Sequence, residues 1–138
     1  MDVRSGGDAM KKAVLYGLGM WVAGTLAIRI AGARALPTGA PLRTAALYLG
    51  SFALMAWAMP RICQGIGIEP SRWFEATTLA MLPTLLLDAW ACLFFTKLYP
   101  NLDPAAAGIF GGWMLMFCAG AVAGIWWGQR KEGISTTR

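Results

Sequence analysis

Four long runs of uncharged residues dominate this chain and limit what it can fold into. They extend over Ala13–Ile28, Thr44–Pro60, Ala76–Thr96 and Pro104–Gln129, and a single charged residue, Asp88, interrupts the third. A transmembrane helix needs about 20 predominantly apolar residues. Because a segment surrounded by lipid must satisfy its backbone hydrogen bonds internally, the four runs predict four membrane-spanning helices.

The composition supports the same fold class. Hydrophobic residues make up 57% of the 138 residues and charged residues 14%, whereas soluble domains carry about 25% charged residues. This excludes a soluble enzyme domain, a disordered chain and a secreted disulfide scaffold. We expect an all-α polytopic membrane protein with a four-helix transmembrane domain over residues 13–129, flanked by a flexible tail at 1–12 and a C-terminal tail at 130–138. The helices are expected at about 12–31, 43–62, 71–98 and 104–129.

The basic residues indicate an orientation. With a cytoplasmic N-terminus, eight Lys and Arg residues lie on the inner side and four on the outer side. The positive-inside rule therefore predicts a multi-pass protein with both termini cytoplasmic. Met10 precedes Lys11 and Lys12 and resembles an initiation site, so Met1 and Met10 both stay open as the start. The first helix is expected to remain uncleaved.

Catalytic and metal-binding signals are missing from the sequence. The chain has no histidine, and its three cysteines are far apart with no CxxC pair. We expect no enzymatic activity, no catalytic residues, no cofactor and no metal site. The net charge of +5 is interpreted as basic residues flanking membrane helices, so lipids are expected as partners and nucleic acid is not.

Asp88 is the most informative residue, because a carboxylate within the hydrocarbon must find a partner or a proton. Counted from Glu75, it lies roughly 19 Å along the third helix, and Arg29 lies roughly 25 Å along the first. We predict an intramembrane ion pair between Arg29 and Asp88, with Thr84 on the same polar face. The pair either locks the helices together or forms part of a proton or cation relay. A carboxylate already neutralised by Arg carries ions poorly, which favours the locking role.

Small residues recur every four positions in two of the predicted helices, and such spacing lets membrane helices approach closely. The set comprises Gly19, Ala23 and Ala27 in the first helix and Gly108, Gly112, Gly120, Gly124 and Gly128 in the fourth. These residues are expected to pack helices within one chain or to meet another chain. Trp73, Trp126 and Trp127 are expected to be anchors at the inner membrane interface.

The segment from Pro83 onward, PTLLLDAWACLFFTKLYPNLDPAAAGIFGG, carries a family resemblance. Its features are Leu-Leu-Asp88 in the third helix, a Tyr-Pro-Asn101-Leu turn, and a Gly-rich aromatic fourth helix. The chain resembles a bacterial family of small four-helix integral membrane proteins, the domain of unknown function 5367. The resemblance implies the same four-span layout, a location in the bacterial inner (cytoplasmic) membrane, and no established activity.

Two functions follow from these observations. The first is a membrane protein without catalytic activity that acts through helix–helix contacts, as an accessory or scaffolding subunit of other membrane subunits or as a homo-oligomer. The small-residue stripes favour it. The alternative is a small proton- or cation-coupled transporter or channel that uses Asp88, with Thr84 lining the path.

Overall fold

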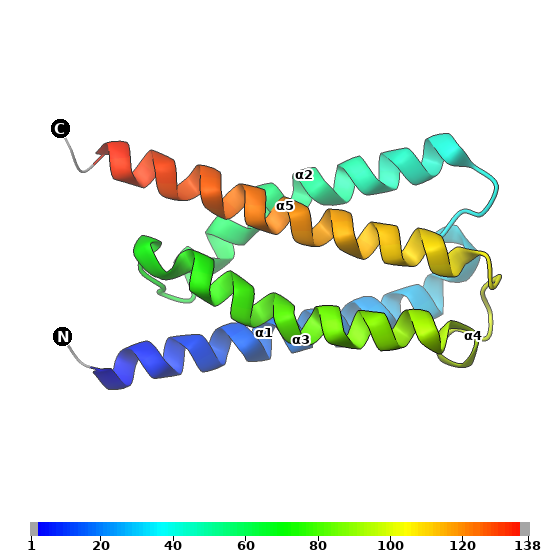
Figure 1. Ribbon diagram of the computed structural model, residues 1–138, viewed down its shortest axis with the longest axis horizontal. Helices are drawn as coiled ribbons and strands as arrows, with labels where there is room; N and C mark the ends of the chain where they lie inside the picture. The colour runs from blue at the N-terminus through cyan, green and yellow to red at the C-terminus, as the bar shows by residue number, and fades with distance from the viewer. Residues whose placement is uncertain (1–2, 136–138) are drawn as a thin grey trace.

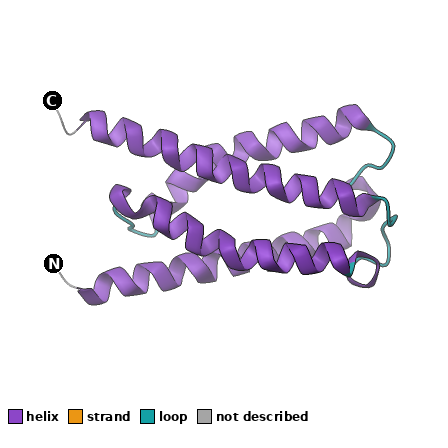
Figure 2. Ribbon diagram, viewed as in Figure 1, coloured by secondary structure: helices purple, strands orange, loops and turns teal. Residues whose placement is uncertain are grey.

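The computed structural model describes residues 3–135, and over this range it contains helices and no strand (Figure 2). Four long helices form the body: α1 (Val3–Ala31), α2 (Pro41–Gly65), α3 (Trp73–Leu93) and α5 (Ala106–Ser135). A one-turn helix, α4 (Phe95–Leu98), and two short 3-10 turns, Gly32–Arg34 and Pro70–Arg72, complete the chain. Each long helix contains a stretch long and apolar enough to cross a membrane, which makes this a multi-pass all-α membrane protein.

The first and last helices extend beyond the predicted spans. α1 begins at Val3 rather than near residue 12, so the predicted flexible N-terminal tail is helical from that residue onward. Met10 packs against the core, and Asp8 and Lys11 form an ion pair at 3.7 Å one turn apart. Adding residues to an existing helix costs far less free energy than nucleating a new one. These two contacts are therefore enough to extend α1 toward the N-terminus. α5 likewise continues into the predicted C-terminal tail, as far as Ser135.

The third span is shorter than the predicted helix of residues 71–98. It ends at Leu93 because Phe94 leaves the helical region, with φ −108° and ψ 30°. The Phe94 ring stacks on Trp90 at a centroid distance of 5.6 Å, and the chain then turns into α4. The turn directs Phe95 and Tyr99 into the core, where their rings pack 5.1 Å apart. Burial of these two aromatic side chains therefore compensates for the interrupted helix.

The four spans alternate in direction, and both chain ends lie at the same end of the bundle (Figure 1). Backbone proximity divides them into two pairs, α1 with α3 and α2 with α5, and contacts between α3 and α5 join the pairs. α1 packs mainly on α3 and has little backbone contact with α2 or α5. The bundle is therefore tight along α2–α5 and looser around α1.

Glycines explain why α2 and α5 approach so closely. A Cβ atom placed on Gly120 would collide with the backbone of Phe52, and one on Gly124 with the backbone of Ala56. Gly17 plays the same part between α1 and α3, where its missing side chain accommodates the carbonyl of Ala80. Close van der Waals contact of this kind drives association of helices in lipid.

The buried residues form two clusters along the bundle. The first surrounds Trp73, Cys63 and Ile125 near the chain ends. The second surrounds Phe95, Tyr99 and Phe110 near the opposite end, beside α4. Between the clusters, the middle of the bundle is not filled by side chains, and this is where the candidate site lies.

Candidate functional site

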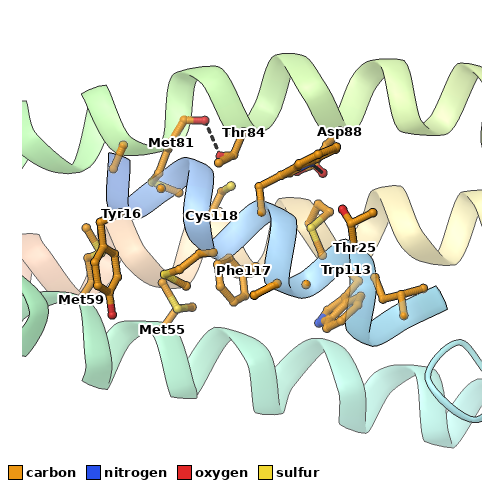
Figure 3. A pocket seen from close by; sticks show the side chains of 18 of the residues that line it. Tyr16, Thr25, Met55, Met59, Met81, Thr84, Asp88, Trp113, Phe117 and Cys118 are labelled. Atoms are coloured by element: carbon orange, nitrogen blue, oxygen red, sulfur yellow. Dashed lines mark hydrogen bonds between the residues drawn. The ribbon is translucent and has the colours of Figure 1, made fainter. Parts of the chain in front are cut away.

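A cavity of about 330 Å³ occupies the middle of the bundle between the two core clusters. All four long helices line it (Figure 3): α1 from Tyr16 to Ile28, α2 with Met55 and Met59, α3 from Ala80 to Asp88, and α5 from Phe110 to Cys118. Its walls are mostly apolar, and aromatic and methionine side chains make up about half of the lining residues. A volume near 300 Å³ lies at the lower end of the range for small-molecule sites in proteins.

Asp88 is the one acidic or basic residue among those that line the cavity. It is 7% exposed, and its Oδ1 atom accepts a hydrogen bond of 2.8 Å from the indole N–H of Trp21 in α1. A tryptophan donates a hydrogen bond but carries no charge. The carboxyl group is therefore held in place by a neutral partner, and no Lys or Arg is among the described residues that line the cavity with it.

Arg29 does not pair with Asp88, which corrects the predicted ion pair. The Arg29 side chain is exposed, and the ion pairs among the described side chains are Asp8–Lys11 and Arg72–Glu75. The backbone carbonyl of Arg29 instead accepts a hydrogen bond of 2.8 Å from the amide of Asn101.

Helical phase accounts for this error. Gly17 marks the side of α1 that touches α3. At 3.6 residues per turn, Trp21 lies about 40° from that direction and Arg29 about 120° from it. Arg29 is at a suitable height on the helix but on the wrong side. The four-residue spacing of Ala13, Gly17 and Trp21 is the signal in the sequence that locates Trp21.

The other polar groups of the cavity are largely occupied. Thr84 lies one turn before Asp88, as predicted, but its hydroxyl donates to the carbonyl of Met81 at 2.6 Å (Figure 3). The indole N–H of Trp113 donates to the hydroxyl of Ser51. Thr25 and Tyr16 also line the wall. The site thus offers few free hydrogen-bonding groups apart from Asp88.

The predicted small-residue stripes separate into an inner and an outer set. Gly112, Gly120, Gly124 and Gly128 all face neighbouring segments of the same chain. Gly112 meets the ring of Tyr48, and Gly128 meets Trp73 and Pro60. Around Gly19 and Gly108 the space is open, and Ala23 and Ala27 are exposed. Packing within one chain therefore uses most of the α5 stripe and leaves the α1 stripe on the outside.

The three tryptophans predicted to be interfacial anchors have different surroundings. Trp73 is a core residue rather than an anchor, because it is 1% exposed and its indole N–H donates to the carbonyl of Ile68 at 2.8 Å. Trp126 and Trp127 are exposed on α5. The guanidinium of Arg130 lies 3.7 Å from the ring centroid of Trp126. Their location at a membrane interface stays a prediction.

Tyr99, whose ring centroid lies 5.7 Å from that of the cavity residue Phe110, has an unusual hydroxyl. The residue is fully buried, and its Oη atom has no hydrogen-bond partner among the described residues. Burial raises the pKa of the phenol above its ordinary value, and the nearby Thr25 hydroxyl opposes this only in part. Sequence reasoning missed this group.

Comparison with known proteins places the chain in a wider group without giving it an activity. The model of a family described as a family of unknown function (DUF5367) matches residues 36–132. The match covers α2, α3, α4 and most of α5, including Asp88, but not α1 with Trp21. No curated protein and no solved structure matches the chain. Among the described residues, no group of three or more His, Cys, Asp or Glu side chains is placed to hold a metal ion.

Proposed function

The chain belongs to this family of unknown function, and we propose that it is a small membrane carrier in which Asp88 alternately holds a proton and a cationic substrate. One observation carries the proposal: a nearly buried carboxylate with an uncharged hydrogen-bond donor beside an empty space in the middle of the bundle. Ionisable groups inside membrane bundles mark substrate and ion pathways and proton relays, so such a residue is by default a candidate functional site.

The neutral partner is central to this argument. An arginine bound to Asp88 would cancel its charge, and removing that arginine to admit a substrate would cost several kcal/mol, of the order of 3–5. Trp21 orients the carboxylate without cancelling its charge. The ionised group can therefore gain either a proton or a cation, and the two exclude each other. This is the basic requirement for exchange of one against the other.

A carrier is favoured over a channel by what lies above and below the cavity. The cluster around Trp73 and Ile125 packs one end of the bundle, and the cluster around Tyr99 and Phe110 packs the other. A pore would need a continuous opening past both. For ligands that enter from water, a site between two packed ends instead requires alternating opening, as in transporters with a site near the membrane midplane.

The test is proton movement coupled to a cation gradient. The purified chain is reconstituted into liposomes containing a pH-sensitive dye, and a panel of sodium, potassium and organic ammonium ions is added outside. We expect at least one cation to drive protons across the membrane, Asp88→Asn to abolish this movement, and Glu69→Gln to preserve it. Glu69 is an exposed acid in the α2–α3 loop and serves as a matched control. Proton movement that is absent with every cation, or unchanged in Asp88→Asn, would refute the carrier.

A second candidate is self-association or assembly with another membrane subunit. The specific observation in its favour is the exposed stripe of Gly19, Ala23 and Ala27 on α1, where a Cβ placed on Gly19 would meet no neighbouring described segment within 4 Å. Small residues at this spacing suit close contact between helices. Cross-linking in native membranes tests it: Gly19→Leu is expected to reduce a cross-linked species that Gly108→Leu leaves intact.

A further inference from the structure

We propose that the ligand of this cavity is a hydrophobic organic monocation, such as a quaternary ammonium ion with an aromatic group, and not a hydrated inorganic cation. The inference rests on the proposed function and specifies its substrate class. It follows from the juxtaposition of one carboxylate, Asp88, with the aromatic side chains of Trp21, Phe110 and Phe117 around a single cavity.

The charges around the cavity set the charge of the ligand. Asp88 supplies one negative charge, and no Lys or Arg is among the described residues that line the space. The other titratable groups around Asp88 and the cavity are two thiols and two phenols. They belong to Cys92 on α3, Cys118 on α5, Tyr16 on α1 and Tyr99 directly after α4, and α2 contributes none of them. Thiols and phenols are ordinarily uncharged at neutral pH. One positive charge therefore neutralises the site, and a second would be left uncompensated.

The scarcity of hydrogen-bonding groups excludes strongly hydrated ions. Calcium takes six to eight oxygen ligands and magnesium requires six. Here Asp88 is the single carboxylate among the lining residues, the hydroxyl of Thr84 is already engaged with a backbone carbonyl, and the hydroxyls of Thr25 and Tyr16 are too few to complete six ligands. An inorganic cation would lose its water without replacement. A quaternary ammonium ion has no N–H groups to satisfy, so the same walls suit it.

The aromatic walls provide the remaining attraction. A cation within about 6 Å of an aromatic ring is attracted to its face, and this is how quaternary ammonium ligands are commonly held. The N–H groups of Trp21 and Trp113 are bound to Asp88 and Ser51, which fixes the two rings at the cavity wall. Phe117 projects into the same space from α5 (Figure 3).

The position of the cavity also gives a hydrophobic ligand a route from the bilayer. Met81 of α3 and Cys118 of α5 line the cavity and also line a second, apolar groove on the outer surface between these helices. The groove includes exposed side chains such as Phe74 and Trp126. Met81, a flexible methionine, and Cys118 therefore lie between the cavity and the groove on the outer surface. A ligand that dissolves in the bilayer can reach Asp88 by this route without crossing either packed end.

The experiment compares two ligands of the same shape and different charge. Binding of benzyltrimethylammonium to the purified full chain in detergent is measured by calorimetry, next to neopentylbenzene, in which a carbon atom replaces the nitrogen, and next to sodium chloride. We expect saturable binding of the ammonium ion alone. Its affinity falls about tenfold per pH unit in the acidic range, where protons compete for the carboxylate.

Variants assign the binding to the cavity. Asp88→Asn is expected to weaken binding by about thirtyfold or more and to remove its pH dependence, whereas Asp88→Glu keeps the pH dependence. Phe117→Leu is expected to weaken binding about three- to tenfold, since it keeps an apolar wall but removes the ring face. Phe94→Leu, at an exposed position that lines neither the cavity nor the outer groove, is the matched control and leaves the affinity unchanged. Circular dichroism confirms that each variant is folded.

The outcomes separate the two proposals. Equal binding of neopentylbenzene, tighter binding of sodium, or no saturable binding of the ammonium ion overturns the substrate class, even where liposomes still show Asp88-dependent proton movement. Ammonium binding that persists unchanged in Asp88→Asn also overturns it. Absence of Asp88-dependent proton movement refutes the carrier instead, and cation binding at the cavity then stands by itself.

Discussion

The indole N–H of Trp21 in α1 donates a 2.8 Å hydrogen bond to Asp88 Oδ1 in α3, and this bond joins two helices from opposite halves of the sequence. Trp21→Phe preserves most of the ring but leaves the buried carboxylate without its donor. We expect the free energy of unfolding to fall by about 1–3 kcal/mol, the usual cost of a buried polar group left unsatisfied. Unfolding by SDS in mixed micelles, followed by circular dichroism, measures it.

The double variant provides the control for this bond. In an Asp88→Asn background the acceptor is no longer ionised, so Trp21→Phe should cost measurably less than in the parent chain. Equal costs in the two backgrounds would mean that Trp21 stabilises the bundle by its ring alone.

The close contact of α2 and α5 predicts a strong difference between two glycines of the same helix. Gly124→Ala places a methyl group against the backbone of Ala56, and we expect a loss of about 1–3 kcal/mol from overpacking. A methyl group on Gly108 would meet no atom of a neighbouring described segment within 4 Å, so Gly108→Ala should be neutral or stabilising by up to about 1 kcal/mol. The same SDS titration compares them, and similar losses at both sites would contradict the observed contact.

The partnerless hydroxyl of Tyr99 makes an unusual prediction for a buried polar group. Tyr99→Phe removes an oxygen that no described residue binds, so stability should stay unchanged or rise by about 1 kcal/mol. Tyr48→Phe is the matched variant, because the Tyr48 hydroxyl donates to the carbonyl of Ile109 at 3.1 Å. It should lose about 0.5–1.5 kcal/mol. The reverse order of the two variants would show that Tyr99 has a partner.

Tyr99 also predicts how stability depends on alkaline pH. Burial raises the pKa of this phenol above 10.0, so the folded chain holds the proton more tightly than the unfolded chain does. The resulting stabilisation is complete below the unfolded pKa of about 10 and is lost as the pH rises through the folded pKa. The parent chain should therefore lose stability faster than Tyr99→Phe above that pH, as measured by thermal unfolding in detergent. Parallel curves would contradict the prediction.

Much of the fold is predictable from the sequence, for a simple physical reason. A backbone surrounded by lipid must make its hydrogen bonds internally, which leaves few possible conformations. Uncharged runs such as Thr44–Pro60 and Pro104–Gln129 therefore identify helices directly. The helix ends are less predictable. The break at Phe94 depends on tertiary burial of Phe95 and Tyr99, and the early start of α1 depends on contacts of Met10 with the core.

The candidate site is predictable in part. The importance of Asp88 follows from the free-energy cost of placing a carboxylate inside a membrane. The identity of its partner depends instead on which side of α1 faces α3. Counting residues along a helix gives height and not direction, so it selects Arg29 and misses Trp21. The cavity depends on how side chains of all four long helices fit together, and no local pattern encodes that.

The uneven distribution of glycine contacts has a mechanical consequence. The backbones of α2 and α5 are in contact at Gly120 and Gly124. Moving these two helices relative to each other would therefore break contacts along their whole length. α1 packs mainly on α3, through Gly17 and the Trp21–Asp88 hydrogen bond, and it lines one side of the cavity. The α2–α5 pair is thus the more tightly held part of the molecule, and a carrier of the proposed kind is expected to move α1, the long helix with the fewest backbone contacts.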